Sequence, residues 1–120
     1  MTINPYSDQT PFTTKDGSTI RSLLDLTNAP VELQSLAEAT LPPEGATERH
    51  YHKVSEEFYY ILEGVGTMEV DSELRKIKPG DAILIPRNAW HQITADNEEG
   101  GLKFLCCCAP PYSHEDTYFS

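Results

Sequence analysis

The sequence has few cysteines, and they stand side by side. Cys106, Cys107 and Cys108 are consecutive, so on a strand they would alternate faces and could not reach one another in ordinary disulfide geometry. Adjacent thiolates also lack the gap of about two to four residues with which cysteines wrap a zinc ion. We therefore expect reduced thiols that pack in a core, with a redox role as the alternative.

Long hydrophobic runs and basic residues are scarce as well. No segment of about 20 apolar residues is present, so no membrane span is expected. The first residues lack a basic start followed by an apolar run, so we expect no secretory signal and a cytoplasmic location. Nine Lys and Arg stand against 19 Asp and Glu, a net charge of −10. This charge disfavours nucleic acid and anionic membranes as partners and leaves a small molecule or another protein.

Helical periodicity, repeats and linker-like tracts are also missing from the 120 residues. In their place the chain carries short β-branched and aromatic runs bounded by Gly, Pro, Asp and Asn, which predict an all-β sandwich or jelly-roll barrel of about eight to ten strands with little helix. The residues after 109 should hold at most a helical turn. The expected strands cover residues 19–26, 33–41, 48–52, 57–62, 67–70, 74–78, 79–86, 90–95 and 102–109.

The stretch "HYHKVSEEFYY" carries the chemistry. His50 and His52 point the same way if residues 48–52 form a strand, because side chains alternate with period two. Alternation along the next strand groups Glu57 with Tyr59, and Glu57 would face both histidines across an antiparallel pair. His91 follows a strand and a turn and is the best fourth donor. Imidazole with carboxylate suits iron, manganese, nickel, copper or zinc better than calcium or magnesium.

These residues match two spaced motifs, and through them the chain resembles the cupin superfamily. The first motif is G-x5-H-x-H-x3,4-E-x6-G and the second is G-x5-P-x-G-x2-H-x3-N. Seven positions agree with the motifs in identity and spacing: His50, His52, Glu57, Gly64, Gly80, Pro86 and His91.

Three positions depart from the motifs. Gly45 lies one residue too close to His50, Asn88 replaces a glycine, and Ala95 replaces the final asparagine. Asn tolerates the left-handed backbone better than other non-glycine residues, so Asn88 should still make the turn. Ala95 removes a polar side chain without touching the ligand positions.

The resemblance implies one domain: a cupin barrel over residues 36–109, N-terminal strands and an arm over residues 1–35, and a tail over residues 110–120. It also implies one divalent transition metal (Fe, Mn, Ni or Zn), held by His50, His52, Glu57 and His91. Glu56 is the competing carboxylate, since the motif allows the shorter gap, but strand parity favours Glu57. Cupins commonly pair, so a homodimer is expected. Alternation along the strand also turns the apolar side chains of Phe58, Tyr60 and Leu62 outward, which supports a dimer.

Two functions follow as hypotheses. The first is a metalloenzyme of dioxygenase or sugar-isomerase type acting on a small oxygen-bearing molecule. The second is a non-catalytic binding module for a sugar or metabolite; a structural cupin with a vacant site is a third possibility, disfavoured because all four donor positions are filled. Tyr59, which shares the face of Glu57, and His114, which could reach the barrel mouth from the tail, are the candidate catalytic residues.

Overall fold

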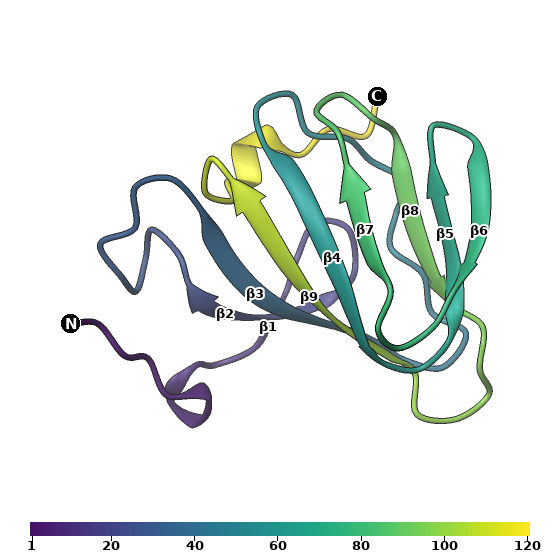
Figure 1. Ribbon diagram of the computed structural model, residues 1–120, viewed down its shortest axis with the longest axis horizontal. Coiled ribbons are helices and arrows are strands. Elements are labelled where there is room, and N and C mark those ends of the chain that lie inside the picture. Colours follow the sequence, from purple (N-terminus) through teal and green to yellow (C-terminus); the bar gives the residue numbers. More distant parts are fainter.

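The computed structural model describes residues 1–120, and its regular structure is antiparallel β-sheet with two short 3-10 turns (Figure 1). This confirms the all-β prediction and the near absence of helix. The elements in chain order are η1 (Tyr6–Asp8), β1 (Phe12–Thr13), β2 (Thr19–Leu24), β3 (Ser35–Leu41), β4 (Glu56–Glu63), β5 (Gly66–Val70), β6 (Glu73–Ile77), β7 (Ala82–Ile85), β8 (His91–Ala95), β9 (Leu102–Ala109) and η2 (His114–Asp116).

The strands form two sheets. One has six strands in the order β1-β2-β3-β9-β4-β7, and the other has three in the order β6-β5-β8. Chain neighbours such as β4 and β5 lie in different sheets, while β9 returns to pair with both β3 and β4. The chain thus crosses repeatedly between the sheets, which is jelly-roll connectivity. No helix in this fold is long and apolar enough to cross a bilayer.

Alternating burial along the strands places the core between the sheets. In β4, Glu57, Tyr59 and Ile61 are buried while the residues between them are exposed. Phe104 on β9 and Ile93 on β8 are almost fully buried and belong to the same apolar cluster. Each such side chain stabilises the fold by roughly 1.5–3 kcal/mol. The same alternation turns Cys106 and Cys108 inward and leaves Cys107 half-buried, with all three thiols free, as predicted.

The turn between β7 and β8 positions a site residue. Asn88 adopts a φ of +69°, the left-handed conformation expected for the residue that replaces the motif glycine. Its backbone N–H donates to the carbonyl of His52 at 2.6 Å. The motif glycine Gly64 has a φ of +89°, and a side chain there would collide with the carbonyl of Gly101.

The strand predicted over residues 48–52 is wrong. That segment makes only isolated bridges, from His50 to His91 at the edge of β8 and from Tyr51 to Tyr118 in the tail. Glu57 pairs with Ile85 on β7 and with Cys108 on β9, so it does not face the histidines across a ladder. The physical reason is that the segment contacts two different partners in succession, which prevents a continuous ladder with either.

The C-terminal tail lies across one end of the sheets rather than extending into solvent. It is held against the segment before β4, because Tyr118 bridges to Tyr51 and the Asp116 carboxylate binds the backbone of residues 53–55. The predicted helical turn is present as η2, and Asp116 and Thr117 are both buried. The tail therefore forms part of the wall above the two histidines of residues 48–52.

Candidate metal centre

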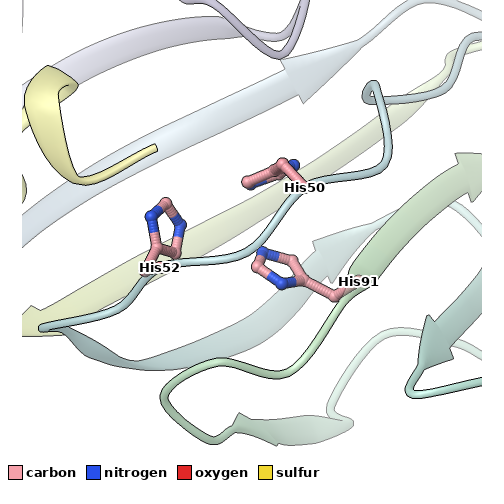
Figure 2. A group of neighbouring side chains, drawn as sticks. All are labelled: His50, His52 and His91. Carbon is pink, nitrogen blue, oxygen red and sulfur yellow. The ribbon is translucent and has the colours of Figure 1, made fainter. Parts of the chain in front are cut away.

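Three histidines converge in the interior. His50 and His52 come from the segment before β4, and His91 opens β8 (Figure 2). His50 and His91 exchange two backbone hydrogen bonds, of 3.1 and 2.8 Å, which set the two rings side by side. One ring nitrogen of each histidine lies within 4.8 Å of those of the other two. The exposed fractions are 2% for His50, 4% for His52 and 0% for His91.

The hydrogen bonds on the far side of each ring fix its tautomer. Nδ1 of His50 lies 2.7 Å from the carbonyl of Glu48, Nδ1 of His52 lies 2.9 Å from the carbonyl of Asp116, and Nδ1 of His91 lies 3.0 Å from the carbonyl of Ala89. A carbonyl only accepts, so each Nδ1 carries the hydrogen. In the neutral ring this leaves a lone pair on each Nε2, the arrangement found in metal-binding histidines.

Glu57 adds a buried carboxylate to this group. Its Oε1 lies 3.5 Å from Nε2 of His52 and 3.6 Å from Nε2 of His91. These contacts are longer than hydrogen bonds, and Oε1 of Glu57 and Nε2 of His91 have no hydrogen-bond partner although both are buried. Lone pairs facing one another in a dry interior are unfavourable unless a cation lies between them. The donor set therefore fits a divalent transition metal.

The pKa values of these side chains follow from burial and from their contacts with one another. Burial, aided by the nearby His91 ring, lowers the pKa of His50 to about 4. Burial opposes ionisation of Glu57, but His52 and His91 outweigh it and hold the pKa of this carboxyl well below its usual range. Burial also opposes protonation of His52, yet Glu57 outweighs it and raises the pKa of His52. Glu57 is therefore anionic at neutral pH, and His50 is neutral.

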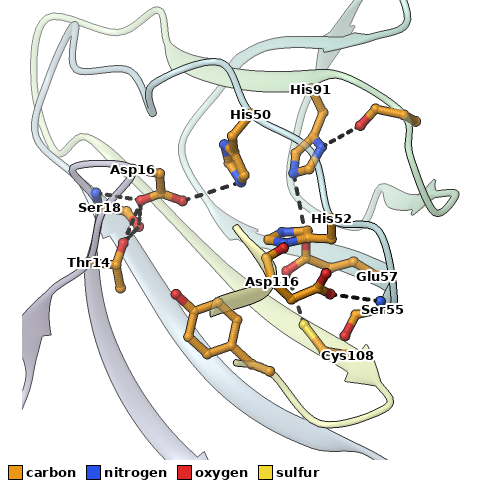
Figure 3. Close-up of polar contacts among 12 residues, drawn as sticks. Thr14, Asp16, Ser18, His50, His52, Ser55, Glu57, His91, Cys108 and Asp116 are labelled. Carbon is orange, nitrogen blue, oxygen red and sulfur yellow. Dashed lines mark hydrogen bonds and ion pairs between the residues drawn. The ribbon is translucent and has the colours of Figure 1, made fainter. Parts of the chain in front are cut away.

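Two groups around the centre come from β9 and the tail. Cys108 donates its S–H to Oε2 of Glu57 at 3.2 Å, which leaves Oε1 facing the histidines. The carboxylate of Asp116 accepts hydrogen bonds from the backbone N–H groups of Lys53, Val54 and Ser55 at 2.9–3.2 Å. Figure 3 shows the bond from Ser55. Because the carbonyl of Asp116 also holds His52, the tail orients one of the three imidazoles.

A third group comes from the N-terminal hairpin. Asp16, in the turn between β1 and β2, places Oδ2 3.7 Å from Nε2 of His50. Sequence reasoning missed Asp16, Cys108 and Asp116 as site residues. Asp16 was visible only as part of an Asp-Gly turn, and the other two carried no local signal, because their contacts with the centre span 51 to 64 residues of chain.

The centre opens into a pocket whose wall includes His50, His52 and Glu57. Its wall also includes Asp16, Tyr59, Phe104 and Tyr112 but no Lys or Arg. Burial and the charge of Glu57 raise the pKa of Tyr59 well above its usual value, so its phenol stays protonated. His114 is exposed and does not line this pocket; its Nδ1 lies 3.1 Å from the hydroxyl of Tyr112, which does.

Comparison with known proteins matches the cupin domain model to residues 37–108 of this chain. The uncharacterized protein MJ1618 of Methanocaldococcus jannaschii is 49% identical over 112 residues, which cover 93% of this chain and 89% of that protein. Polyketide synthase CurC of Streptomyces cyaneus is 30% identical over 86% of this chain and 70% of its own length. Quercetin 2,3-dioxygenase of Bacillus subtilis is 38% identical over only 48 residues, 40% of this chain and 14% of the enzyme.

Solved structures give the same fold. The polyketide cyclase RemF from Streptomyces resistomycificus superposes with a TM-score of 0.75 at 25% identity, over 91% of this chain and 79% of that one. KdgF from Halomonas sp. superposes with a TM-score of 0.81 over 96% of this chain and 98% of its own, at 14% identity, and supports the fold alone. The residues that match the cupin domain model, 37–108, include all four predicted ligand positions.

Proposed function

The chain belongs to the cupin family, and on that premise we propose that it is a metal-dependent enzyme acting on a small, enolisable or phenolic oxygen compound. The observation that carries the proposal is the set of three inward Nε2 lone pairs beside an unpartnered oxygen of Glu57, all buried. When bound there, iron, manganese, nickel or zinc would supply Lewis-acid polarisation of a substrate oxygen. His50, His52, Glu57 and His91 are the residues we assign to hold it.

The surroundings favour chemistry on a carbon skeleton over simple metal storage. Phe104 and Tyr59 give the pocket an apolar wall that excludes water from one side of the substrate. The phenol of Tyr59 stays protonated near the Glu57 carboxylate, so it can donate a hydrogen bond to a substrate oxygen. We retain Tyr59 as a candidate catalytic residue in that role. His114 remains a candidate only through its contact with Tyr112.

The relatives favour the same substrate class. The names of CurC and RemF associate them with polyketides, which are chains of enolisable carbonyls, and quercetin 2,3-dioxygenase takes a phenolic substrate. Ring closure and isomerisation need only polarisation and proton transfer, whereas a dioxygenase also consumes oxygen. We therefore propose isomerase- or cyclase-type chemistry first and dioxygenase chemistry second, the second being favoured if the protein selects iron.

The experiment begins with elemental analysis of protein purified without chelators, comparing wild type with His52→Ala and, as a matched control, His114→Ala. We expect about one transition metal per chain in wild type and in His114→Ala, and a large loss in His52→Ala. Oxygen uptake and product analysis over catechols, diketones and hydroxy-ketones then separate the two chemistries. A wild-type protein that holds no metal and rebinds none would refute the proposal. A tightly bound metabolite that is never converted would favour the binding module instead.

We also retain the homodimer as part of this proposal. Phe58, Tyr60 and Leu84 are 54%, 45% and 53% exposed, and together they cover an apolar surface on paired strands β4 and β7. Surfaces of this kind commonly mark an interface. Sedimentation should give a dimer for wild type and a monomer for Phe58→Glu. Val65→Glu, at an exposed apolar residue outside this patch, is the matched control and should leave the dimer intact.

A further inference from the structure

Asp16 is a carboxylate at the centre that neither cupin motif contains. It lies in the hairpin turn between β1 and β2, outside the residues matched by the cupin domain model. The turn is fixed against the histidine segment, because the backbone N–H of Glu48 donates to the carbonyl of Asp16 at 2.7 Å. Since the carbonyl of Glu48 holds His50, the hairpin and the imidazole are positioned together.

The two oxygens of Asp16 have different surroundings. Oδ1 accepts three hydrogen bonds, from the Thr14 hydroxyl at 2.6 Å, the Ser18 hydroxyl at 2.6 Å and the Ser18 backbone N–H at 2.9 Å (Figure 3). These bonds hold the carboxylate in one orientation. Oδ2 accepts none and faces the lone pair of His50 Nε2 at 3.7 Å, with the side chain only 15% exposed. A fixed, free acceptor thus borders the pocket.

Asp16 also changes the charge of the pocket. Figure 3 shows it beside His50, while Glu57 lies near His52 and His91. Asp25 also lines the pocket, so three carboxylates and three neutral imidazoles give a formal charge of −3, and a divalent cation would still leave the site negative. No Lys or Arg lines the pocket to balance a further negative charge. An anionic substrate would therefore enter an enclosed site without compensation, which is unfavourable at low dielectric.

We propose that Asp16 is the residue that selects neutral, hydroxyl-bearing substrates at this centre. Its free Oδ2 accepts a hydrogen bond from a substrate hydroxyl, and its charge repels anions. The substrate class is a neutral molecule with a hydroxyl next to a carbonyl or to a second hydroxyl, such as a catechol, an enediol or a hydroxy-ketone. Dicarboxylates and phosphorylated sugars are excluded. This inference rests on the proposed function, because it takes the histidines to hold a metal.

The test uses full-length protein loaded with Co²⁺, with catechol as the neutral probe and oxalate as the anionic probe, both measured by titration calorimetry. In Asp16→Asn we expect catechol to bind about tenfold more weakly, because the charged acceptor is lost, and oxalate about tenfold more tightly, because one of the repelling charges is lost. Glu56→Gln is the matched control. It removes one negative charge from the exposed neighbouring position on β4 and should leave both affinities unchanged.

A second variant separates charge from position. Asp16→Glu keeps the charge but moves the acceptor oxygen, so it should reject oxalate as wild type does while losing the catechol affinity. Folding of each variant is checked by its thermal transition, and Asp16→Glu tests the proposal even if Asp16→Asn does not fold.

Three other results would count against the inference or against the proposed function. Unchanged preference between catechol and oxalate in Asp16→Asn would overturn the inference. A tenfold loss of Co²⁺ affinity in that variant would overturn it too, because Asp16 would then be a metal ligand. Failure of wild type to bind Co²⁺ at all, measured before either probe is added, would instead count against the proposed function.

Discussion

Removing the carboxylate of Asp116 should weaken both the fold and the metal centre, although this residue holds no metal in our assignment. Asp116 is 7% exposed, and its carboxylate accepts hydrogen bonds from the backbone N–H groups of Lys53, Val54 and Ser55. It therefore anchors the tail to the loop that follows His52. In Asp116→Ala, all three donors lose their acceptor at once.

The expected magnitude follows from which donors water can reach. Val54 is 54% exposed and Lys53 is also exposed, so their N–H groups can bond to solvent after the change, whereas Ser55 is 5% exposed. Net hydrogen bonds to charged groups contribute about 1.5–3 kcal/mol, and a buried unsatisfied donor costs about 1–3 kcal/mol. With one buried N–H group left unpaired and two that water can reach, we expect the free energy of unfolding to fall by roughly 3 kcal/mol.

Metal binding should weaken for a second reason. The backbone carbonyl of Asp116 accepts the Nδ1–H of His52 at 2.9 Å, so a displaced tail lets the His52 ring reorient. Losing the hydrogen bond that orients a metal-binding histidine lowers the metal affinity by about 10–100-fold. The backbone group itself remains in the variant, so the effect on metal binding reports displacement of the tail.

The assay is urea denaturation of metal-free protein, followed by Zn²⁺ titration at pH 7.5 against a competing chelator. Asp116→Asn should lose roughly 1–2 kcal/mol, because the amide keeps one acceptor but turns its NH₂ toward the backbone donors. Glu115→Ala, at the exposed neighbour, should change the free energy of unfolding by less than about 0.5 kcal/mol. If Asp116→Ala matched Glu115→Ala in both measurements, the tail would not support the centre and the reasoning would be refuted.

Three further predictions concern the metal ligands and the thiols. Glu57 raises the pKa of His52 above its usual value, so a metal must displace a proton from His52 when it binds. The affinity for Zn²⁺ should therefore fall by up to about tenfold per pH unit below that pKa. Zn²⁺ titrations between pH 8 and pH 6 that show no dependence on pH would contradict this prediction. Cys108→Val should weaken Zn²⁺ binding about tenfold by removing the donor to Glu57, whereas Cys108→Ser and the control Cys107→Ser should bind like wild type in the same titration. Burial raises the pKa of Cys106 and Cys108. A thiol reagent at pH 8 should therefore label only Cys107 quickly in native protein, and all three thiols in urea. Rapid labelling of a second thiol in native protein would count against the buried orientation of Cys106 and Cys108.

Much of the site was predictable because strand parity is a local property. Alternation along β4 grouped Glu57 with Tyr59 and Ile61 on the buried face, as the structure has them. The turn at Asn88 also followed from a residue preference, and its φ of +69° bears this out. Periodicity and turn chemistry act over a few residues, so they can be read from the chain itself.

The geometry between segments was not predictable in the same way. We expected Glu57 to meet His50 and His52 across one ladder, whereas β4 pairs with β7 and β9 and the histidine segment makes only single bridges. Pairing partners depend on which strands the whole chain brings together. A sequence motif records which residues recur at a given spacing, but not which strands pair.

The sequence by itself determined the all-β class and the alternation that buries Glu57, because these depend on residue type and on a period of two; its two motifs predicted the four donors. Only the tertiary structure decided that Asp16, Cys108 and Asp116 surround those donors. Each reaches the centre from a hairpin, a last strand or a tail that packs against it through contacts distant in sequence. Such contacts form when the two sheets close over a shared apolar core, and no local pattern encodes them.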